Sequence, residues 1–83
     1  MNYEQRKARI RWHCRRGMLE LDFLLERFIQ LKLDNMSATE MDLFETLLAQ
    51  PDPDLYAWLM GYETSSNKDL ADYVTHIRSH HQF

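Results

Sequence analysis

The stretch from residue 18 to residue 33 constrains the fold most, because its apolar side chains recur at the spacing of an α-helix. They stand three or four residues apart, at Met18, Leu21, Leu24, Leu25, Phe28 and Leu31. In a helix this spacing gathers them on one wide face that other parts of the chain must cover. We therefore predict a helix over residues 18–33 that supplies much of the core. Leu19 and Phe23 lie off this face and either widen it or stay exposed for a partner.

Residues 3–16 precede this helix and are rich in Glu, Gln, Arg, Lys and Ala, which are good helix formers. We predict a helix here with Ile10 and Cys14 on one face and Trp12 as a core anchor rather than a binding platform. The alternation of apolar residues at positions 10, 12 and 14 also fits a strand.

Capping signals predict the starts of three more helices. Ser37 is a candidate N-cap, Glu40 completes a capping box, and Met36 and Met41 form a hydrophobic staple. The inner face of that helix comprises Met41, Phe44, Leu47 and Leu48.

A fourth helix is predicted between Asp52, as N-cap with Pro53 in the first helical position, and Gly61 at its end. A fifth begins after Ser66 or Asn67 and has its apolar face at Leu70, Tyr73, Val74 and Ile77.

The predicted fold class is therefore all-α: a compact bundle of five short helices in a single domain across residues 1–83. Two glycines and two prolines in 83 residues favour helices over a turn-rich β fold. So short a chain has a thin core, and we expect no sizeable enzyme cavity. The predicted core is Leu21, Leu25, Phe28, Phe44, Leu48, Leu55, Trp58, Leu59, Val74 and Ile77.

Charge is distributed unevenly along the chain. Residues 1–16 carry six basic side chains and one acidic one, whereas the remainder carries four basic and twelve acidic ones. A basic end suggests a locally acidic partner or nucleic acid, but the acidic remainder would repel a nucleic-acid backbone. With no apolar run of 18 residues and one cysteine, we expect no membrane insertion, no internal disulfide and a cytoplasmic location.

The reactive side chains form no convincing catalytic or metal-binding pattern. His76 and His80 have a helical spacing that suits a metal, but no third ligand accompanies them, and we expect solvated tail histidines. His13 and Cys14 are neighbours that project in different directions, so we expect Cys14 to pack as a small apolar residue. We predict a binding module that is not an enzyme and has no catalytic, cofactor-binding or metal-binding residues of its own.

The most distinctive surface feature is the change from basic to acidic residues around Gly17. Arg15 and Arg16 precede this glycine, and Glu20 and Asp22 fall in the first turn of the following helix. Glycine suits a backbone with positive φ or a close approach by another surface. The plainer interpretation is a turn between two helices with charges at its surface; the alternative is a binding site.

Two motifs resemble the family of FAD assembly factors of succinate dehydrogenase (SdhE type). Residues 7–22 read KARI-x-W-x-CRRGM-x-ELD, and residues 52–60 read DPDL-x-x-WLM. The resemblance implies a five-helix protein that binds the flavoprotein subunit of succinate dehydrogenase or fumarate reductase and promotes covalent attachment of FAD to that subunit. It also implies partner-binding roles for Arg9, Arg15, Arg16, Gly17, Glu20 and Asp22. A second hypothesis is an antitoxin that neutralises a small membrane-associated toxin; under either, we expect a monomer.

Overall fold

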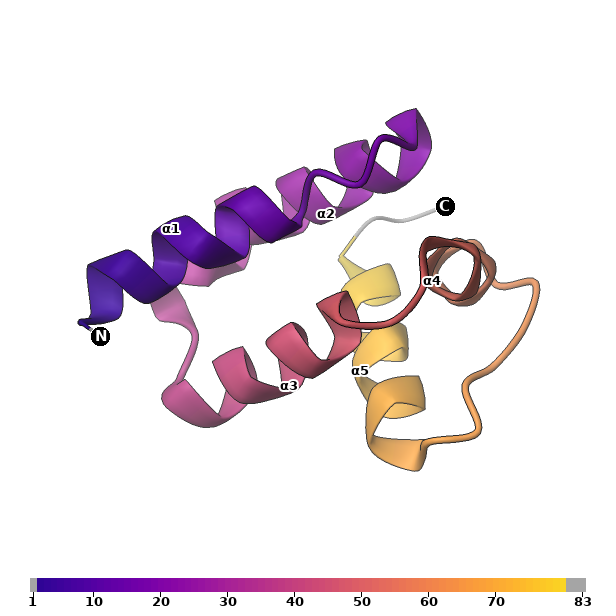
Figure 1. Ribbon diagram of the computed structural model, residues 1–83. Coiled ribbons are helices and arrows are strands. Elements are labelled where there is room, and N and C mark those ends of the chain that lie inside the picture. The colour runs from indigo at the N-terminus through magenta and orange to yellow at the C-terminus, as the bar shows by residue number, and fades with distance from the viewer. Residues whose placement is uncertain (1, 81–83) are drawn as a thin grey trace.

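A computed structural model describes residues 2–80 and contains five α-helices, with no strand among those residues (Figure 1). The elements are α1 (Tyr3–His13), α2 (Leu19–Lys32), a 3-10 turn η1 (Leu33–Asn35), α3 (Ala38–Leu48), α4 (Asp52–Leu59) and α5 (Lys68–Ser79). The predicted all-α bundle of five short helices is confirmed. The strand interpretation of residues 10–14 is wrong, because the backbone is helical up to His13.

The helices pack around an aromatic cluster formed by three of them. Phe28 of α2 lies 5.7 Å from Phe44 of α3 and 6.1 Å from Tyr73 of α5, between ring centroids, and Phe44 lies 6.0 Å from Tyr73. The rings meet at tilted or edge-on angles, the arrangement that aromatic quadrupoles prefer. Figure 1 shows α1 running back along α2, so that α1 covers one side of this body.

The predicted core is largely confirmed. Nine of its ten members are buried, and Trp58 is half-buried against the core rather than enclosed. The inner faces predicted for α3 and α5 are buried in full.

Two predicted core positions outside that set are wrong. Trp12 is 70% exposed, because α1 presents one face to the body and Ile10 and Cys14 occupy it, while Trp12 projects from another side. Leu31 is 54% exposed. It stands at one margin of the apolar stripe, roughly 70° around α2 from its centre. The groove between α1 and α2 lies along the opposite margin, where Ile29 is buried although the stripe did not include it.

The capping predictions for α3 and α5 are confirmed in their main hydrogen bonds. The Ser37 side chain accepts the backbone N–H of Glu40 at 3.1 Å, and Asn67, rather than Ser66, accepts that of Leu70 at 3.2 Å. The Glu40 carboxylate, expected to complete a capping box, instead accepts the Tyr73 hydroxyl at 2.9 Å. A tertiary partner therefore occupies this side chain.

The ends of α4 differ from the prediction by one residue at the start and agree at the finish. Pro51 is the N-cap and Asp52 the first helical residue. Gly61 has φ +81°, and the N–H of Tyr62 bonds the carbonyl of Ala57 at 2.8 Å. This is the Schellman arrangement, which needs a left-handed residue after the helix and so favours glycine.

Candidate partner-binding site

Helix α1 ends at His13, three residues earlier than predicted, and the side chain of Arg16 fastens that end. Its guanidinium donates to the carbonyl of His13 at 3.0 Å, to the carbonyl of Gln50 at 3.1 Å and to the carboxylate of Asp52 at 2.7 Å. These bonds join the end of α1 to the connection between α3 and α4. Arg16, half-buried, is therefore part of the internal structure as well as a predicted partner-binding residue.

We call residues 15–22 the corner, and the carboxylate of Asp22 holds its backbone. One oxygen accepts the N–H of Arg16 at 2.6 Å, and the other accepts the N–H of Gly17 at 3.3 Å. Asp22 lies in the first turn of α2, so these bonds fix the path of the chain as it enters that helix. The structure thus brings Arg16, Gly17 and Asp22 into one hydrogen-bonded unit.

Gly17 has a positive φ, at +83°, which is one of the two roles that the sequence suggested for it. A Cβ built at this position would meet no atom within 4 Å, so the space above the glycine is open to another molecule. A residue with a side chain would still be strained by about 1–2 kcal/mol in this left-handed conformation. Gly17 therefore allows the left-handed backbone of the turn and leaves the surface above it open.

Glu20 is exposed at the start of α2, beside α4. The hydroxyl of Tyr56 donates to its Oε2 at 3.1 Å, and this bond raises the pKa of Tyr56 above its usual value. No cation pairs with Glu20 among residues 2–80, because Arg16, its expected neighbour, pairs with Asp52 instead. The neutral hydroxyl of Tyr56 orients the Glu20 carboxylate without neutralising its charge, so the carboxylate can still pair with a cation of another molecule.

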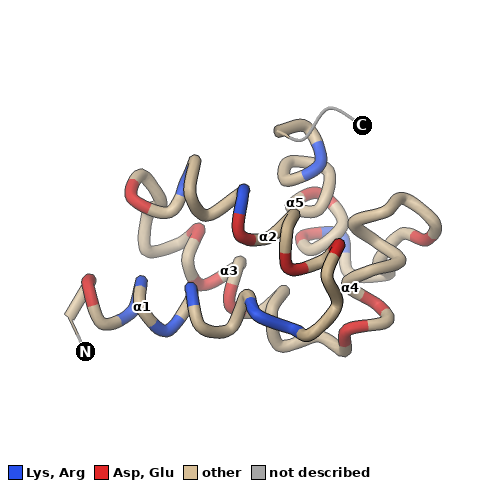
Figure 2. The backbone as a smooth tube through the Cα atoms, turned by 90° about the horizontal axis from the view of Figure 1, so that it is seen from above, with Lys and Arg blue, Asp and Glu red and all other residues tan. Residues whose placement is uncertain are grey.

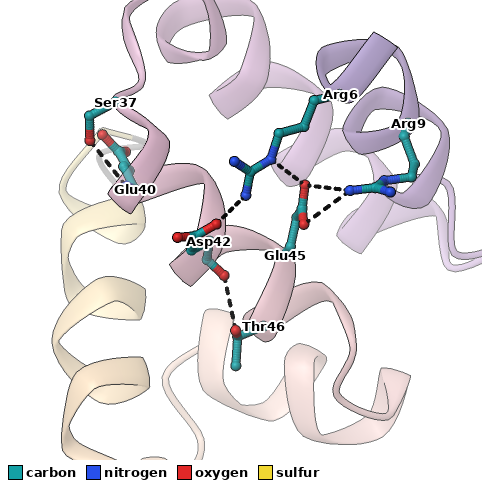
Figure 3. A network of polar contacts seen from close by, with 7 residues as sticks. All are labelled: Arg6, Arg9, Ser37, Glu40, Asp42, Glu45 and Thr46. Carbon is teal, nitrogen blue, oxygen red and sulfur yellow. Dashed lines mark hydrogen bonds and ion pairs between the residues drawn. The ribbon is translucent and has the colours of Figure 1, made fainter. Parts of the chain in front are cut away.

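Arg9 lies on α1 where that helix faces α3 (Figure 3). Its guanidinium donates to both oxygens of Glu45, at 3.2 and 3.3 Å, and Arg6 bonds Glu45 and Asp42. Arg6 and then Arg9 hold the pKa of Glu45 below its usual value. Arg9 and Arg16 line one shallow hollow of about 500 Å³ against α3.

Arg15 points away from that hollow into a groove of about 470 Å³ between α1 and α2. Trp12 and Asp22 line the same groove, so Trp12 joins the surface near the corner although the sequence placed it in the core. The signal for its exposure was its offset of two residues from both Ile10 and Cys14.

Two reactive side chains, Cys14 and His80, pack inward, whereas His13 lines the hollow with Arg9 and Arg16. Cys14 is buried, as predicted, and burial raises the pKa of its thiol to about 12, which keeps it protonated. His80 packs 5.8 Å from the ring of Phe28, and burial lowers its pKa. The prediction of a solvated tail is wrong for His80, and His81 lies outside the described residues. Residues 2–80 hold no group of three or more potential metal ligands.

The fold and the corner together define a class of protein: a small all-helical binding domain that presents fixed charges on a rigid frame. Its polar corner residues are set by hydrogen bonds between elements, as in surfaces that recognise another protein. None of the helices within residues 2–80 has the length and apolar character needed to cross a bilayer.

Comparisons with known proteins identify the family. The chain belongs to the family described as "Flavinator of succinate dehydrogenase" (Sdh5), which matches residues 8–81. It is 48% identical over 73 residues to the FAD assembly factor SdhE of Legionella pneumophila strain Paris, covering 88% of this chain and 91% of that one. It is 45% identical over 78 residues to the protein of the same name from Coxiella burnetii, covering 94% and 95%. The resemblance inferred from the two motifs is confirmed.

A solved structure has the same fold. The solution structure of a UPF0350 protein is 44% identical in sequence and superposes with a TM-score of 0.77, covering 98% of this chain and 86% of that one.

Proposed function

We propose that this protein binds the flavoprotein subunit of succinate dehydrogenase or fumarate reductase and promotes covalent attachment of FAD to that subunit. The observation that carries the proposal is membership of the flavinator family over residues 8–81. The FAD belongs to the client, and this chain contributes no cofactor of its own.

The protein acts by binding rather than by chemistry of its own side chains. It stabilises a client conformation that is competent for flavin attachment, which shifts the client population toward that conformation. The buried, protonated thiol of Cys14 is unsuited to attack an electrophile.

The corner is the proposed contact surface. Glu20 offers a carboxylate oriented by Tyr56, Gly17 leaves open space beside it, and Arg15 carries an exposed positive charge. Arg16 and Asp22 keep the corner in shape, and Arg9 extends the basic surface along α1. Loss of Glu20 at a desolvated contact would leave a client donor unpaired, at a cost of about 2 kcal/mol or more of binding free energy.

The decisive experiment replaces Glu20 by alanine and measures covalent flavin in the client by in-gel fluorescence. We expect Glu20→Ala to melt within a few degrees of the wild type and yet fail to raise covalent flavin, and Arg9→Ala to weaken assistance as well. The matched control is Asp69→Ala, which removes an exposed first-turn acid from α5 and should leave assistance intact. Full assistance by Glu20→Ala, or its unfolding, would show that the corner is only a structural turn.

A second experiment tests the absence of a catalytic group. Cys14→Ala, and the combined replacement of His76, His80 and His81 by alanine, should both support flavin attachment at the wild-type level. Loss of attachment in either variant with the fold preserved would contradict the binding mechanism.

We also propose that the protein is a cytoplasmic monomer. Light scattering coupled to size-exclusion chromatography and fractionation of cells test these two statements separately.

A further inference from the structure

Two large apolar side chains, one within the corner and one directly after it, are exposed to solvent. Leu19 is 86% exposed and Phe23 is 61% exposed. They stand four residues apart on α2 and therefore project from the same side of the helix. With Leu24 and Met60 they enclose a hollow of about 490 Å³, and the only polar side chain lining it is that of Glu20.

The fold does not account for this hollow. Leu24 belongs to the core and Met60 packs against it, but Leu19 and Phe23 do not contribute to it. Leu31 is also exposed on α2, but it does not line this hollow. Tyr62, exposed after the end of α4, packs its ring at a tilt against that of Tyr56, with 6.1 Å between the centroids, and the Tyr56 hydroxyl bonds Glu20. The apolar surface is therefore continuous with the carboxylate of the corner.

Charge indicates what kind of group fits here. Glu20 pairs with no cation within residues 2–80, and the other side chains that line the hollow are uncharged. A complementary surface would place an apolar side chain in the hollow and a basic group against Glu20, because a carboxylate buried by a partner without a cation is costly.

A second copy of this chain fits the hollow poorly. Leu19 and Phe23 together expose roughly 300 Å², given about 150–250 Å² for a whole large side chain. A stable dimer buries about 800 Å² on each partner. A two-fold contact would also bring two Glu20 carboxylates to the same surface. The hollow has the size of one anchor within a larger contact that continues over the corner.

We infer that this hollow receives an apolar side chain of the flavoprotein client, next to a basic client residue that pairs with Glu20. The inference rests on the proposed function. It adds that the client segment at this contact carries an apolar side chain and a neighbouring basic residue. Leu19 and Phe23 are then binding residues outside the family signature.

The test measures binding of the apo flavoprotein subunit by calorimetry, together with covalent flavin. Leu19→Ala should weaken binding about tenfold and the double change Leu19→Ala with Phe23→Ala roughly 100-fold, since truncated anchors dominate such contacts. Leu31→Ala is the matched control, the same change at an exposed leucine of the same helix, and should bind as the wild type. Glu20→Gln, which keeps the shape and removes the charge, should bind about tenfold more weakly and with a flatter salt dependence.

The outcomes separate this inference from the proposed function. If the wild type raises covalent flavin but the double variant, folded by circular dichroism, binds the client as tightly, the inference fails and the function stands. If the wild type neither binds the client nor raises its flavin, both fail. If the wild type dimerises in sedimentation and the double variant is monomeric, a second copy occupies the hollow and the inference is wrong.

Discussion

Helix α1 and the body formed by α2 to α5 are held in different ways. In α1 the buried residues are Ile10 and the stem of Lys7, followed by Cys14 at its cap, whereas the body buries an apolar face from every helix. Of the eight ion pairs among residues 2–80, six join residues 6–16 to other elements. Figure 2 shows the Lys and Arg positions following α1 and the corner, with Asp and Glu spread over the other helices.

The helices that stabilise the fold are therefore largely different from the element that carries the basic partner-binding residues. A fully buried large apolar side chain contributes about 1.5–3 kcal/mol and is insensitive to salt, whereas exposed ion pairs typically contribute 0–1 kcal/mol and are screened by it. The body therefore supplies the frame, and the predicted partner-binding residues lie on or beside the element that charge helps to hold. Attachment of α1 should respond to salt and pH while the body does not.

The largest expected effect comes from the aromatic cluster of the body. Phe28→Ala removes a ring that contacts α3 and α5 and should lower the free energy of unfolding by about 3–5 kcal/mol. Urea denaturation followed by circular dichroism measures the loss. Leu31→Ala, on the exposed side of the same helix, should change stability by less than about 0.5 kcal/mol. Similar losses for the two variants would refute the packing of α2 described above.

A smaller effect is expected at the junction of the two regions. Asp22→Ala removes the acceptor for two backbone N–H groups and should cost about 1–3 kcal/mol, with faster hydrogen exchange at Arg16 and Gly17. Asp54→Ala removes an exposed first-turn acid from α4 and should cost only about 0.3–1 kcal/mol. Equal costs would mean that Asp22 acts only through the helix dipole.

The ion pairs between α1 and α3 should matter locally rather than globally. Replacing Arg6 and Arg9 by glutamine should speed hydrogen exchange of α1 amides several-fold and leave α5 unchanged, because the body keeps its core. High salt should reproduce this effect in the wild type and add little in the variant. Uniformly faster exchange in all helices would show that α1 and the body open together.

The smallest effect is the pH dependence of the same contact. The pKa of Glu45 is lower in the folded protein than its usual value of 4.5, since Arg6 and Arg9 stabilise the carboxylate. Its stabilising contribution is therefore present above pH 4.5 and is lost as pH falls through the lowered pKa. An NMR titration of the Glu45 carboxyl should show this depression in the wild type and not after the two arginines are replaced.

Local patterns predicted the parts of the fold that depend on neighbours in sequence. Ser37 and Asn67 cap their helices because a short polar side chain reaches an N–H two or three residues ahead in any context. The apolar faces of α3 and α5 follow from helical spacing alone. Local patterns failed at Glu40. Its carboxylate accepts a hydrogen bond from the hydroxyl of Tyr73, 33 residues away, in place of the predicted capping bond.

By itself the sequence determined the helical class, the inner faces of α3 and α5, most of the core and the family. Only the tertiary structure decided that Trp12 is exposed, that Arg16 and Asp22 fasten the corner, and that Leu19 and Phe23 border a hollow beside Glu20. The physical reason is that helical periodicity fixes which side chains share a face. Whether that face is covered depends on which distant helix packs against it, and on which carbonyl or carboxylate that packing brings within hydrogen-bonding distance.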